Sequence, residues 1–301
     1  MKHSAKEWLA VTRYWSFPVS AMPVIVTFTY LLSLGLVPQD QGPMPYICFA
    51  LALLGVVILH SAGNVLSDYY DYKTGVDNPD AFAVPNLVFK KFEPREYLIF
   101  SIILFVVGCA IGLALTLLVG WRLLVVGGIG VLLTAGYSFL KYRALGDADI
   151  FIIFSVLIML GSSLAITGEI HPEVLVLALP VGIITVSVLH ANNTFDIVSD
   201  GNAGMKSFAM ILGGKASSRL YMIYMCVPFV SVIVAVAAGW LSPFALLSLG
   251  AAVPAFGNFK AASHYDDKGI GTMAGLDQAS AKLQLMFSGL LSIGLIISAI
   301  I

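Results

Sequence analysis

Two short stretches of the sequence combine asparagine and aspartate at helical spacing. In HSAGNVLSDYYDYKTGVD, residues 60–77, Asn64, Asp68 and Asp71 stand at i, i+4 and i+7, so a helix would place them within about 60° of one another. The stretch HANNTFDIVSD, residues 190–200, repeats the arrangement at i, i+4 and i+8 with Asn192, Asp196 and Asp200. Both stretches end an apolar run, where a membrane helix would meet water.

Side chains of this kind, gathered at two helix ends, predict a cation site. A lone carboxylate at the end of a membrane helix is often only solvated. Two clusters would instead concentrate mutually repelling charge beside hydrocarbon, and Asp77 adds a further carboxylate to the first cluster. A hard divalent ion relieves that repulsion. Carboxylate and amide oxygens suit Mg²⁺, which commonly shares its ligand shell with substrate phosphates. Two facing clusters could therefore hold a diphosphate through Mg²⁺.

The elements that carry these clusters are predicted to be membrane helices. The chain has 301 residues, of which 59% are hydrophobic and 11% charged, and apolar runs of about 18 or more residues recur along it. Mean hydropathy is +0.93. Nine apolar segments can be read, at 14–36, 46–67, 97–119, 122–140, 150–167, 173–195, 220–239, 243–258 and 283–301. We therefore predict an all-α integral membrane protein with nine transmembrane helices.

The distribution of basic residues predicts the orientation of these segments. With the N-terminus inside, 15 of the 16 Lys and Arg residues fall in internal segments, and only Arg122 falls outside. This places the N-terminus in the cytoplasm, the C-terminus outside and both aspartate clusters on the cytoplasmic face. The longest internal loop, 68–96, is too short for a separate soluble domain, so we expect one domain over 1–301. Within the loop 68–96, the segment DAFAVPNLVFKKFEPREY could form a short interfacial helix or a plain connector. No basic tract suggests nucleic acid, and Cys48, Cys109 and Cys226 read as small buried hydrophobes.

The two motifs, 64–77 and 192–200, resemble those of the UbiA superfamily of intramembrane prenyltransferases. The resemblance rests on NVLSDYYDYKTGVD and on NNTFDIVSD followed by GMKS. It extends from residue 12 to the C-terminus through TRYWSFPVSAMP, YSFLKYRALGDADIF and LDQASAKLQLMFSGLL. The DYYDYKTGVD form is most similar to the 1,4-dihydroxy-2-naphthoate polyprenyltransferase branch, which serves menaquinone biosynthesis, and so implies a prokaryotic cytoplasmic membrane.

The resemblance implies a helical bundle around a central cavity with the two motifs at its cytoplasmic mouth. Two Mg²⁺ ions would join the diphosphate of a polyprenyl donor to the aspartates, and an aromatic or other hydrophobic acceptor would attack the resulting allylic cation. The implied metal ligands are Asp68, Asp71, Asp77, Asp196 and Asp200. The implied diphosphate-binding residues are Asn64, Lys73, Tyr137, Lys141, Arg143, Asn192 and Lys206. The basic members could instead serve only membrane orientation.

Other residues and other functions remain open at this stage. His60, one turn before Asn64, could orient an acceptor hydroxyl, act as a base or simply bond a neighbouring helix, and His190 lies off the second motif's stripe. Gly108, Gly112 and the glycines of 127–130 predict close helix packing. The chain departs from the quinone branch after Asp77, where NPDAFAVPNLVFKKF stands, so 4-hydroxybenzoate, a glycerol-phosphate lipid or terpene cyclisation are alternatives. A cation-coupled transporter is a further one, although its site would lie near the membrane midplane. The sequence predicts nothing about oligomeric state.

Overall fold

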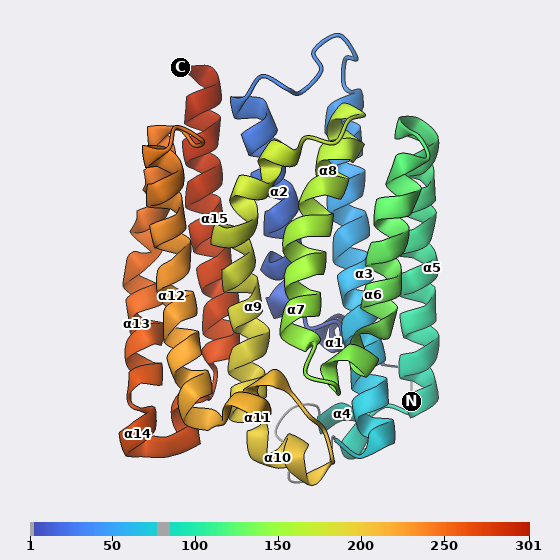
Figure 1. The fold of residues 1–301 in the computed structure, drawn as a ribbon. Helices are drawn as coiled ribbons and strands as arrows, with labels where there is room; N and C mark the ends of the chain where they lie inside the picture. The colour runs from blue at the N-terminus through green and yellow to red at the C-terminus, as the bar shows by residue number, and fades with distance from the viewer. Residues whose placement is uncertain (1–2, 77–84) are drawn as a thin grey trace.

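A computed structural model describes residues 3–76 and 85–301 of the chain. Within these residues it contains helices and turns and no strand. Nine helical spans in this part of the chain are long and apolar enough to cross a membrane, which confirms the predicted number. Figure 1 shows them packed side by side as one bundle, with α4 and α10 at one end and the C-terminus at the other.

The nine spans follow the chain in order, several of them built from two consecutive helical pieces. They are η1–α2 (Tyr14–Ser33), α3 (Met44–Thr74), α5 (Pro94–Val119), α6 (Arg122–Lys141), α7–α8 (Gly146–Thr167), η3–α9 (Pro172–Phe195), α12 (Gly214–Ala237), η4–α13 (Pro243–Ser263) and α15 (Leu276–Ile300). Helix α1 (Ala5–Val11) precedes the first span. The short helices between spans are α4 (Pro85–Val88), α10 (Ile197–Asn202), α11 (Phe208–Leu212), α14 (Tyr265–Lys268) and η5 (Gly269–Met273). Between α7 (Gly146–Phe151) and α8 (Ile158–Thr167), residues Ile152–Leu157 form a π-helix.

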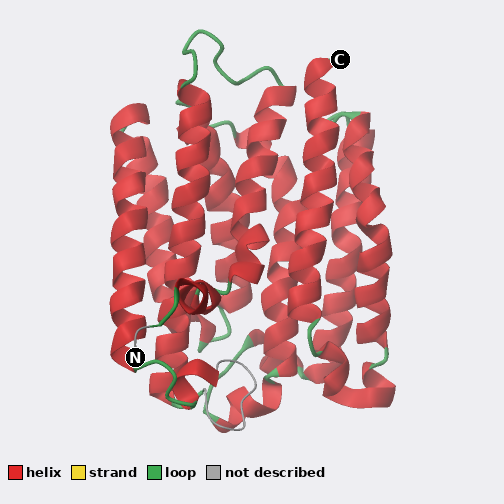
Figure 2. Cartoon of the chain, turned by 180° about the vertical axis from the view of Figure 1, so that it is seen from behind, coloured by secondary structure: helices red, strands yellow, loops and turns green. Residues whose placement is uncertain are grey.

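Burial separates the inner helices from those that face lipid. In the span of α9, 72% of the most apolar window is buried inside the protein, and in the span of α2 the share is 61%. The corresponding share is 11% for both α5 and α6, whose side chains therefore face the hydrocarbon. Helix α15 packs against both α2 and α9. Figure 2 shows the same bundle from behind, with the long helices running side by side.

Three of the spans extend by six or seven residues at one end beyond the predicted apolar segments. Helix α3 continues to Thr74 rather than ending at 67, α12 begins at Gly214 rather than 220, and α15 begins at Leu276 rather than 283. The added turns are polar, and polar residues remain good helix formers once the helix leaves the hydrocarbon. Asp68 and Asp71 consequently lie in the last two turns of α3, close to the helix end. The helix stops where Gly75 adopts a left-handed conformation with φ of 79°.

The loop after α3 contains one short helix within its described part. Helix α4 is a single turn, Pro85–Val88, followed by Lys90 in a left-handed conformation. Leu87 and Phe92 are buried against Val11, Val65 and other residues of a small apolar cluster that ties α1 and the loop to α3 and α5. The predicted connector therefore packs on the end of the bundle near the first aspartate motif.

Candidate active site

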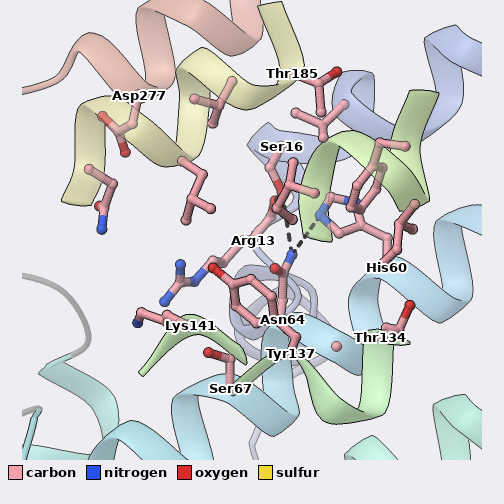
Figure 3. A pocket seen from close by; sticks show the side chains of 18 of the residues that line it. Arg13, Ser16, His60, Asn64, Ser67, Thr134, Tyr137, Lys141, Thr185 and Asp277 are labelled. Carbon is pink, nitrogen blue, oxygen red and sulfur yellow. Dashed lines mark hydrogen bonds between the residues drawn. The ribbon is translucent and has the colours of Figure 1, made fainter. Parts of the chain in front are cut away.

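A cavity of about 130 Å³ lies where the ends of α3, α6 and α9 meet. Its walls come from the segment before α2 and from α2, α3, α6, α7, the π-helix, α9, α10 and the first turn of α15. The residues predicted from the sequence that line it are Asn64, Asp71, Tyr137, Lys141, Asn192, Asp196 and Asp200. Figure 3 shows several of these side chains pointing into a common space. Residues far apart in the sequence thus meet at one site, although whether they bind substrate remains a prediction.

The first aspartate motif is paired with basic side chains from other elements. Because α3 remains helical past residue 71, Asn64, Asp68 and Asp71 share one face of it. Asp68 Oδ1 accepts a hydrogen bond from Arg13 at 2.5 Å, and Asp71 Oδ2 accepts one from Lys141 Nζ at 3.0 Å. Both aspartates are buried, and pairing with a cation offsets part of the cost of burying a charged carboxylate. Asp68 lies behind the cavity wall rather than in it.

Tyr142 is a site residue that the sequence analysis missed. Its hydroxyl donates to Asp71 Oδ1 at 2.7 Å, while Ser67 Oγ lies 3.4 Å from Asp71 Oδ2. Partial burial, together with the nearby charge of Asp71, raises the pKa of Tyr142 above its ordinary value, so the tyrosine stays a neutral donor. Its only sequence signal was its position beside Lys141.

Arg13 is a second residue that was missed. It directly precedes the first apolar segment and lies 55 residues from its partner Asp68, so sequence spacing could not connect them. Its backbone adopts a left-handed conformation with φ of 55°, which is uncommon for a residue with a side chain. The conformation is held where the chain turns from α1 into α2, and Ser16 Oγ donates to the Arg13 carbonyl at 2.8 Å. This turn directs the guanidinium toward α3.

The second aspartate motif spans a break between two helices. Helix α9 ends at Phe195, Asp196 stands outside the ideal helical conformation, and Asp200 belongs to α10. Asn192 Nδ2 donates to Asp196 Oδ2 at 2.9 Å. The predicted spacing on one continuous helix was therefore wrong for Asp200, yet both carboxylates line the cavity.

Burial favours the neutral form of the two carboxylates of the second motif. It is the main cause that raises the pKa of Asp196 to about 6 and that of Asp200 to about 7. The charge of Lys141 acts in the opposite direction at both residues, and for Asp200 the charges of Asp196 and Asp71 raise the pKa further. Within the described residues, neither carboxylate has a Lys or Arg nitrogen within 4.0 Å. This is an environment in which a bound cation would stabilise both anions.

Not every predicted residue reaches the cavity. Lys73 is exposed and its ammonium lies 5.7 Å from the centre of the Tyr69 ring. The guanidinium of Arg143 stacks 3.4 Å from the Phe139 ring, and Lys206 is exposed. None of these three basic residues lines the cavity. Asp77, predicted as a metal ligand, lies outside the described residues.

Two other side chains near the motifs were not among the predicted site residues. Asp277, in the first turn of α15, lines the cavity opposite the first motif. His190 is fully buried behind the second motif, where its Nδ1 lies 2.7 Å from Asp147 Oδ2 and its Nε2 lies 2.9 Å from Ser217 Oγ. His190 therefore joins α7, α9 and α12 to one another, in keeping with its place off the second motif's stripe.

A larger apolar cavity adjoins the polar one. Its volume is about 440 Å³, and it lies between α3, α5, α6 and α8. The two cavities share His60, Thr134, Ile153 and Phe154 as lining residues. A polar chamber and an apolar chamber thus meet at one wall.

The glycines that line the apolar cavity have two different structural roles. Gly108 allows close packing, because a Cβ there would lie 2.6 Å from Leu59 Cδ2. For Gly112, Gly127 and Gly130, in contrast, a Cβ would meet no atom within 4 Å. The packing predicted for these positions is therefore present at Gly108 only. The other glycines widen the cavity.

The oxygen-rich chemistry of the polar cavity fits magnesium better than zinc. Within the described part of the chain, no three His, Cys, Asp or Glu side chains form a cluster that could hold a metal by themselves. Mg²⁺ does not need such a cluster, since it is commonly bound by one or two carboxylates, waters and substrate phosphates. The aspartates of both motifs fit that requirement.

The nine-helix bundle and its cavity are those of an integral membrane protein built around an acidic pocket. The model of the UbiA prenyltransferase family matches residues 20–272, and the chain belongs to this family of prenyltransferases. Mouse UbiA prenyltransferase domain-containing protein 1 is 30% identical over 235 residues, which cover 76% of this chain and 68% of the mouse protein. The chicken protein of the same name is 32% identical over 229 residues, covering 74% and 66%.

Solved structures share the fold at low sequence identity. A UbiA homolog from Aeropyrum pernix K1 aligns with a TM-score of 0.68 and 17% identity, covering 93% of this chain and 97% of that one. A homolog from Archaeoglobus fulgidus bound to GPP and Mg²⁺ aligns with a TM-score of 0.66 and 13% identity, covering 96% and 99%. The predicted superfamily is thereby confirmed. The menaquinone branch and the prokaryotic membrane stay predictions, since the curated relatives described are animal proteins.

Proposed function

We propose that this protein transfers a polyprenyl group from a polyprenyl diphosphate to an aromatic acceptor in a Mg²⁺-dependent reaction of lipid-quinone synthesis. The single observation that carries the proposal is the meeting of the two aspartate motifs and Lys141 in one cavity that adjoins an apolar one. An allylic diphosphate has the matching form, with a strongly anionic head and a long hydrocarbon tail.

The head of the donor is assigned to the polar cavity. Asp71, Asp196 and Asp200, which line the cavity, would hold Mg²⁺ together with the diphosphate oxygens, and Asp68 would join them only by leaving Arg13. We propose two ions, one for each motif. When bound, Mg²⁺ neutralises the charge that develops on the departing diphosphate. Lys141 and Arg13 bring fixed positive charge to the same place, and Asn64, Asn192 and Tyr137 offer neutral polar contacts.

The tail of the donor is assigned to the apolar cavity. The path from one cavity to the other passes the shared residues Ile153 and Phe154, which are apolar. Gly112, Gly127 and Gly130 leave space that helix packing does not use. Burying a hydrocarbon chain there gains roughly 0.8 kcal/mol per CH₂ only if the chain would otherwise be in water. For a donor already dissolved in the bilayer, the cavity mainly orients the chain.

The similar structures support the assignment of the donor and metal. The Archaeoglobus fulgidus homolog has been solved with GPP and Mg²⁺ and also with DMAPP and Mg²⁺. We extend this pairing of prenyl diphosphate and Mg²⁺ to the present chain. We further propose that the end of the bundle with the aspartates faces the cytoplasm, with the C-terminus outside, because the basic residues gather at that end.

The proposal is tested with purified protein, labelled geranylgeranyl diphosphate and a panel of aromatic acceptors. We expect prenylated product that requires Mg²⁺, disappears in EDTA and returns when Mg²⁺ is restored. Asp196→Asn and Asp200→Asn should each lose at least about 100-fold in kcat, since each removes a negative ligand that would hold Mg²⁺ beside the departing diphosphate. Asp266→Asn is the matched control, because Asp266 is exposed and pairs with Lys215 at 2.8 Å outside the cavity. Full turnover in EDTA would refute the proposal.

A further inference from the structure

A buried hydrogen-bond network lies directly behind the second aspartate motif, and the proposed chemistry does not use it. Its members are Asp147 on α7, His190 and Thr194 on α9, and Ser217 on α12. Figure 1 shows α9 between α7 and α12, so the network holds α9 from both sides. The side chains of His190, Thr194 and Ser217 are completely buried. None of the four residues lines the polar or the apolar cavity.

The acceptors around His190 Nε2 show that this nitrogen carries a hydrogen. Thr194 Oγ1 donates its single hydrogen to the His190 carbonyl at 2.6 Å, so it can only accept from Ser217 Oγ, which also lies 2.6 Å away. Ser217 Oγ has thereby used its own hydrogen, and it meets His190 Nε2 at 2.9 Å with a lone pair. The Ser217 carbonyl, which can only accept, lies 3.1 Å from the same nitrogen. His190 Nε2 is therefore the donor to Ser217.

The other nitrogen of His190 shares one hydrogen with Asp147. His190 Nδ1 lies 2.7 Å from Asp147 Oδ2, a distance that requires a hydrogen between the two atoms. This hydrogen belongs either to an imidazolium that faces a carboxylate or to a carboxylic acid that faces a neutral imidazole. In both cases the pair has no net charge and both ring nitrogens are occupied. His190 can consequently act on the cavity only through the elements that it joins.

The short chain between Lys141 and Asp147 is tightly folded against α9. Ala144 turns the chain in a left-handed conformation with φ of 61°. A Cβ on Gly146 would lie 3.5 Å from Lys141 Cα and 3.5 Å from Leu189 Cδ2, so the turn contacts both α6 and α9. A movement of Asp147 relative to α9 would therefore move the backbone of Lys141 as well.

The contact between Asp147 and His190 thus connects the two aspartate motifs. On one side, Lys141 Nζ lies 3.0 Å from Asp71 Oδ2 of the first motif. On the other side, His190 belongs to α9, whose C-terminal end carries Asp196 of the second motif. Carboxylates of both motifs would have to reach one complex of Mg²⁺ and diphosphate, and Mg²⁺ tolerates little departure from its preferred ligand distances. The position of α7 relative to α9 consequently affects how well both motifs can hold the cation.

We propose that His190 is a positioning residue, which sets the separation of the two aspartate motifs through its hydrogen bond to Asp147 and thereby determines the affinity of the cavity for divalent cations. The inference rests on the proposed function, since it concerns the Mg²⁺ of that site. The two hydrogen bonds of the ring have different tasks. The bond to Asp147 fixes α7, and with it Lys141, against α9. The bond to Ser217 anchors α9 to α12, and no residue of α12 lines the polar cavity.

Amide side chains can separate the two hydrogen bonds of His190. In His190→Asn, the amide takes the place of Nδ1 and can still donate to Asp147, whereas the contact to Ser217 is lost. In His190→Gln, the amide takes the place of Nε2 and can donate to the Ser217 carbonyl, whereas the contact to Asp147 is lost. Asp147→Asn keeps a hydrogen between the two residues, because its amide donates to the lone pair of a neutral imidazole.

The measurement is the affinity of the purified protein for Mn²⁺, a spectroscopic substitute for Mg²⁺, by electron paramagnetic resonance with inorganic diphosphate present. We expect the dissociation constant to rise at least about 10-fold in His190→Gln, as when an outer contact of a metal site is removed, and to change less than about 3-fold in His190→Asn and Asp147→Asn. The Mg²⁺ concentration for half-maximal prenyl transfer should follow the same order. The unfolding temperatures of the two His190 variants should fall by similar amounts, because each loses one hydrogen bond.

The comparison of the two His190 variants decides between positioning and a purely structural role. If their affinities for Mn²⁺ fall equally, or follow their unfolding temperatures rather than the contact to Asp147, the inference fails. It also fails if every variant binds Mn²⁺ as tightly as the unmodified protein. Where His190→Gln does not accumulate, Asp147→Ala removes the same bond from the side of α7 and replaces it in the comparison. An unmodified protein that neither binds Mn²⁺ with diphosphate nor transfers a prenyl group would refute the proposed function itself.

Discussion

Removing the charge of Lys141 separates diphosphate binding from membrane orientation. Lys141 is buried, lines the cavity and lies 3.0 Å from Asp71, whereas Lys206 follows the second motif but is exposed. We therefore compare Lys141→Met with Lys206→Met, which removes the same charge from the same end of the bundle. Lys206→Met should change the kinetics less than about 2-fold, because a solvated charge contributes little.

Two effects determine how far the substitution Lys141→Met lowers activity. A charge-assisted hydrogen bond to phosphate is worth roughly 1.5–3 kcal/mol, which predicts a loss of about 10- to 150-fold in kcat/KM. The variant also leaves Asp71 without its cation, and breaking a buried pair costs about 3–5 kcal/mol of stability. Tyr142 still donates to Asp71 at 2.7 Å, so we expect the lower end of that range.

The double variant Asp71→Asn with Lys141→Met distinguishes these two effects. It removes both buried charges, so the thermal unfolding temperature in detergent should return toward that of the unmodified protein. Its activity should stay low, since neither the metal ligand nor the cation is restored. For the single variant, a raised KM for the donor would indicate a contact made equally in the ground state, and a lowered kcat a contact that strengthens as the C1–O bond breaks.

Two results would refute this reasoning. If Lys141→Met and Lys206→Met have the same small effect on donor KM and kcat, the charge of Lys141 serves only orientation. If the activity of Lys141→Met recovers fully in the double variant, the single variant was inactive because it unfolds. In that case the diphosphate must be held by other groups.

The remaining predictions concern the neighbouring tyrosine, the apolar cavity and the orientation. Tyr142→Phe removes a hydrogen bond to the charged Asp71, a bond worth roughly 1.5–3 kcal/mol, and should lower kcat/KM at least about 10-fold, measured by initial rates, with unchanged expression in the membrane. Gly130→Leu fills space that no protein atom uses, so the protein should fold normally but prefer shorter prenyl diphosphates in competition assays; an unchanged preference would show that the tail runs elsewhere. A cysteine at Glu169 should react with an impermeant thiol reagent from outside the cell and one at Lys90 should not, whereas the opposite pattern would reverse the orientation.

The sequence predicted the bundle more completely than the site. Length and hydropathy are enough to identify membrane helices. Helical geometry alone was enough to predict that Asn64, Asp68 and Asp71 share one face. The end of α3 was misplaced because hydropathy detects where hydrocarbon ends, while the helix itself continues to a glycine. The boundary of hydropathy and the boundary of a helix are thus different quantities.

The missed residues have a common cause. Arg13 and Tyr142 act through partners that are distant in sequence, and Arg13 reaches its partner by a left-handed turn that no spacing rule predicts. Lys73 and Lys206 lie within or close to the motifs in sequence and Arg143 lies two residues after Lys141, yet their side chains do not line the cavity. Proximity along the chain identified the right end of the bundle. Only packing shows which basic side chains turn inward.

The border between the apolar cavity and the bilayer has a consequence for kinetics. Leu113, Leu124 and Leu132 line this cavity and are also 53%, 56% and 74% exposed on the lipid side. A donor whose tail enters here never leaves the hydrocarbon, so it avoids the roughly 0.8 kcal/mol per CH₂ that transfer into water would cost. The enzyme then responds to the density of donor in the membrane and not to its bulk concentration. Adding inert lipid at a constant amount of donor should slow the reaction by surface dilution. A KM expressed as the mole fraction of donor in the membrane should stay constant, whereas a KM expressed in molar units should change with the amount of lipid.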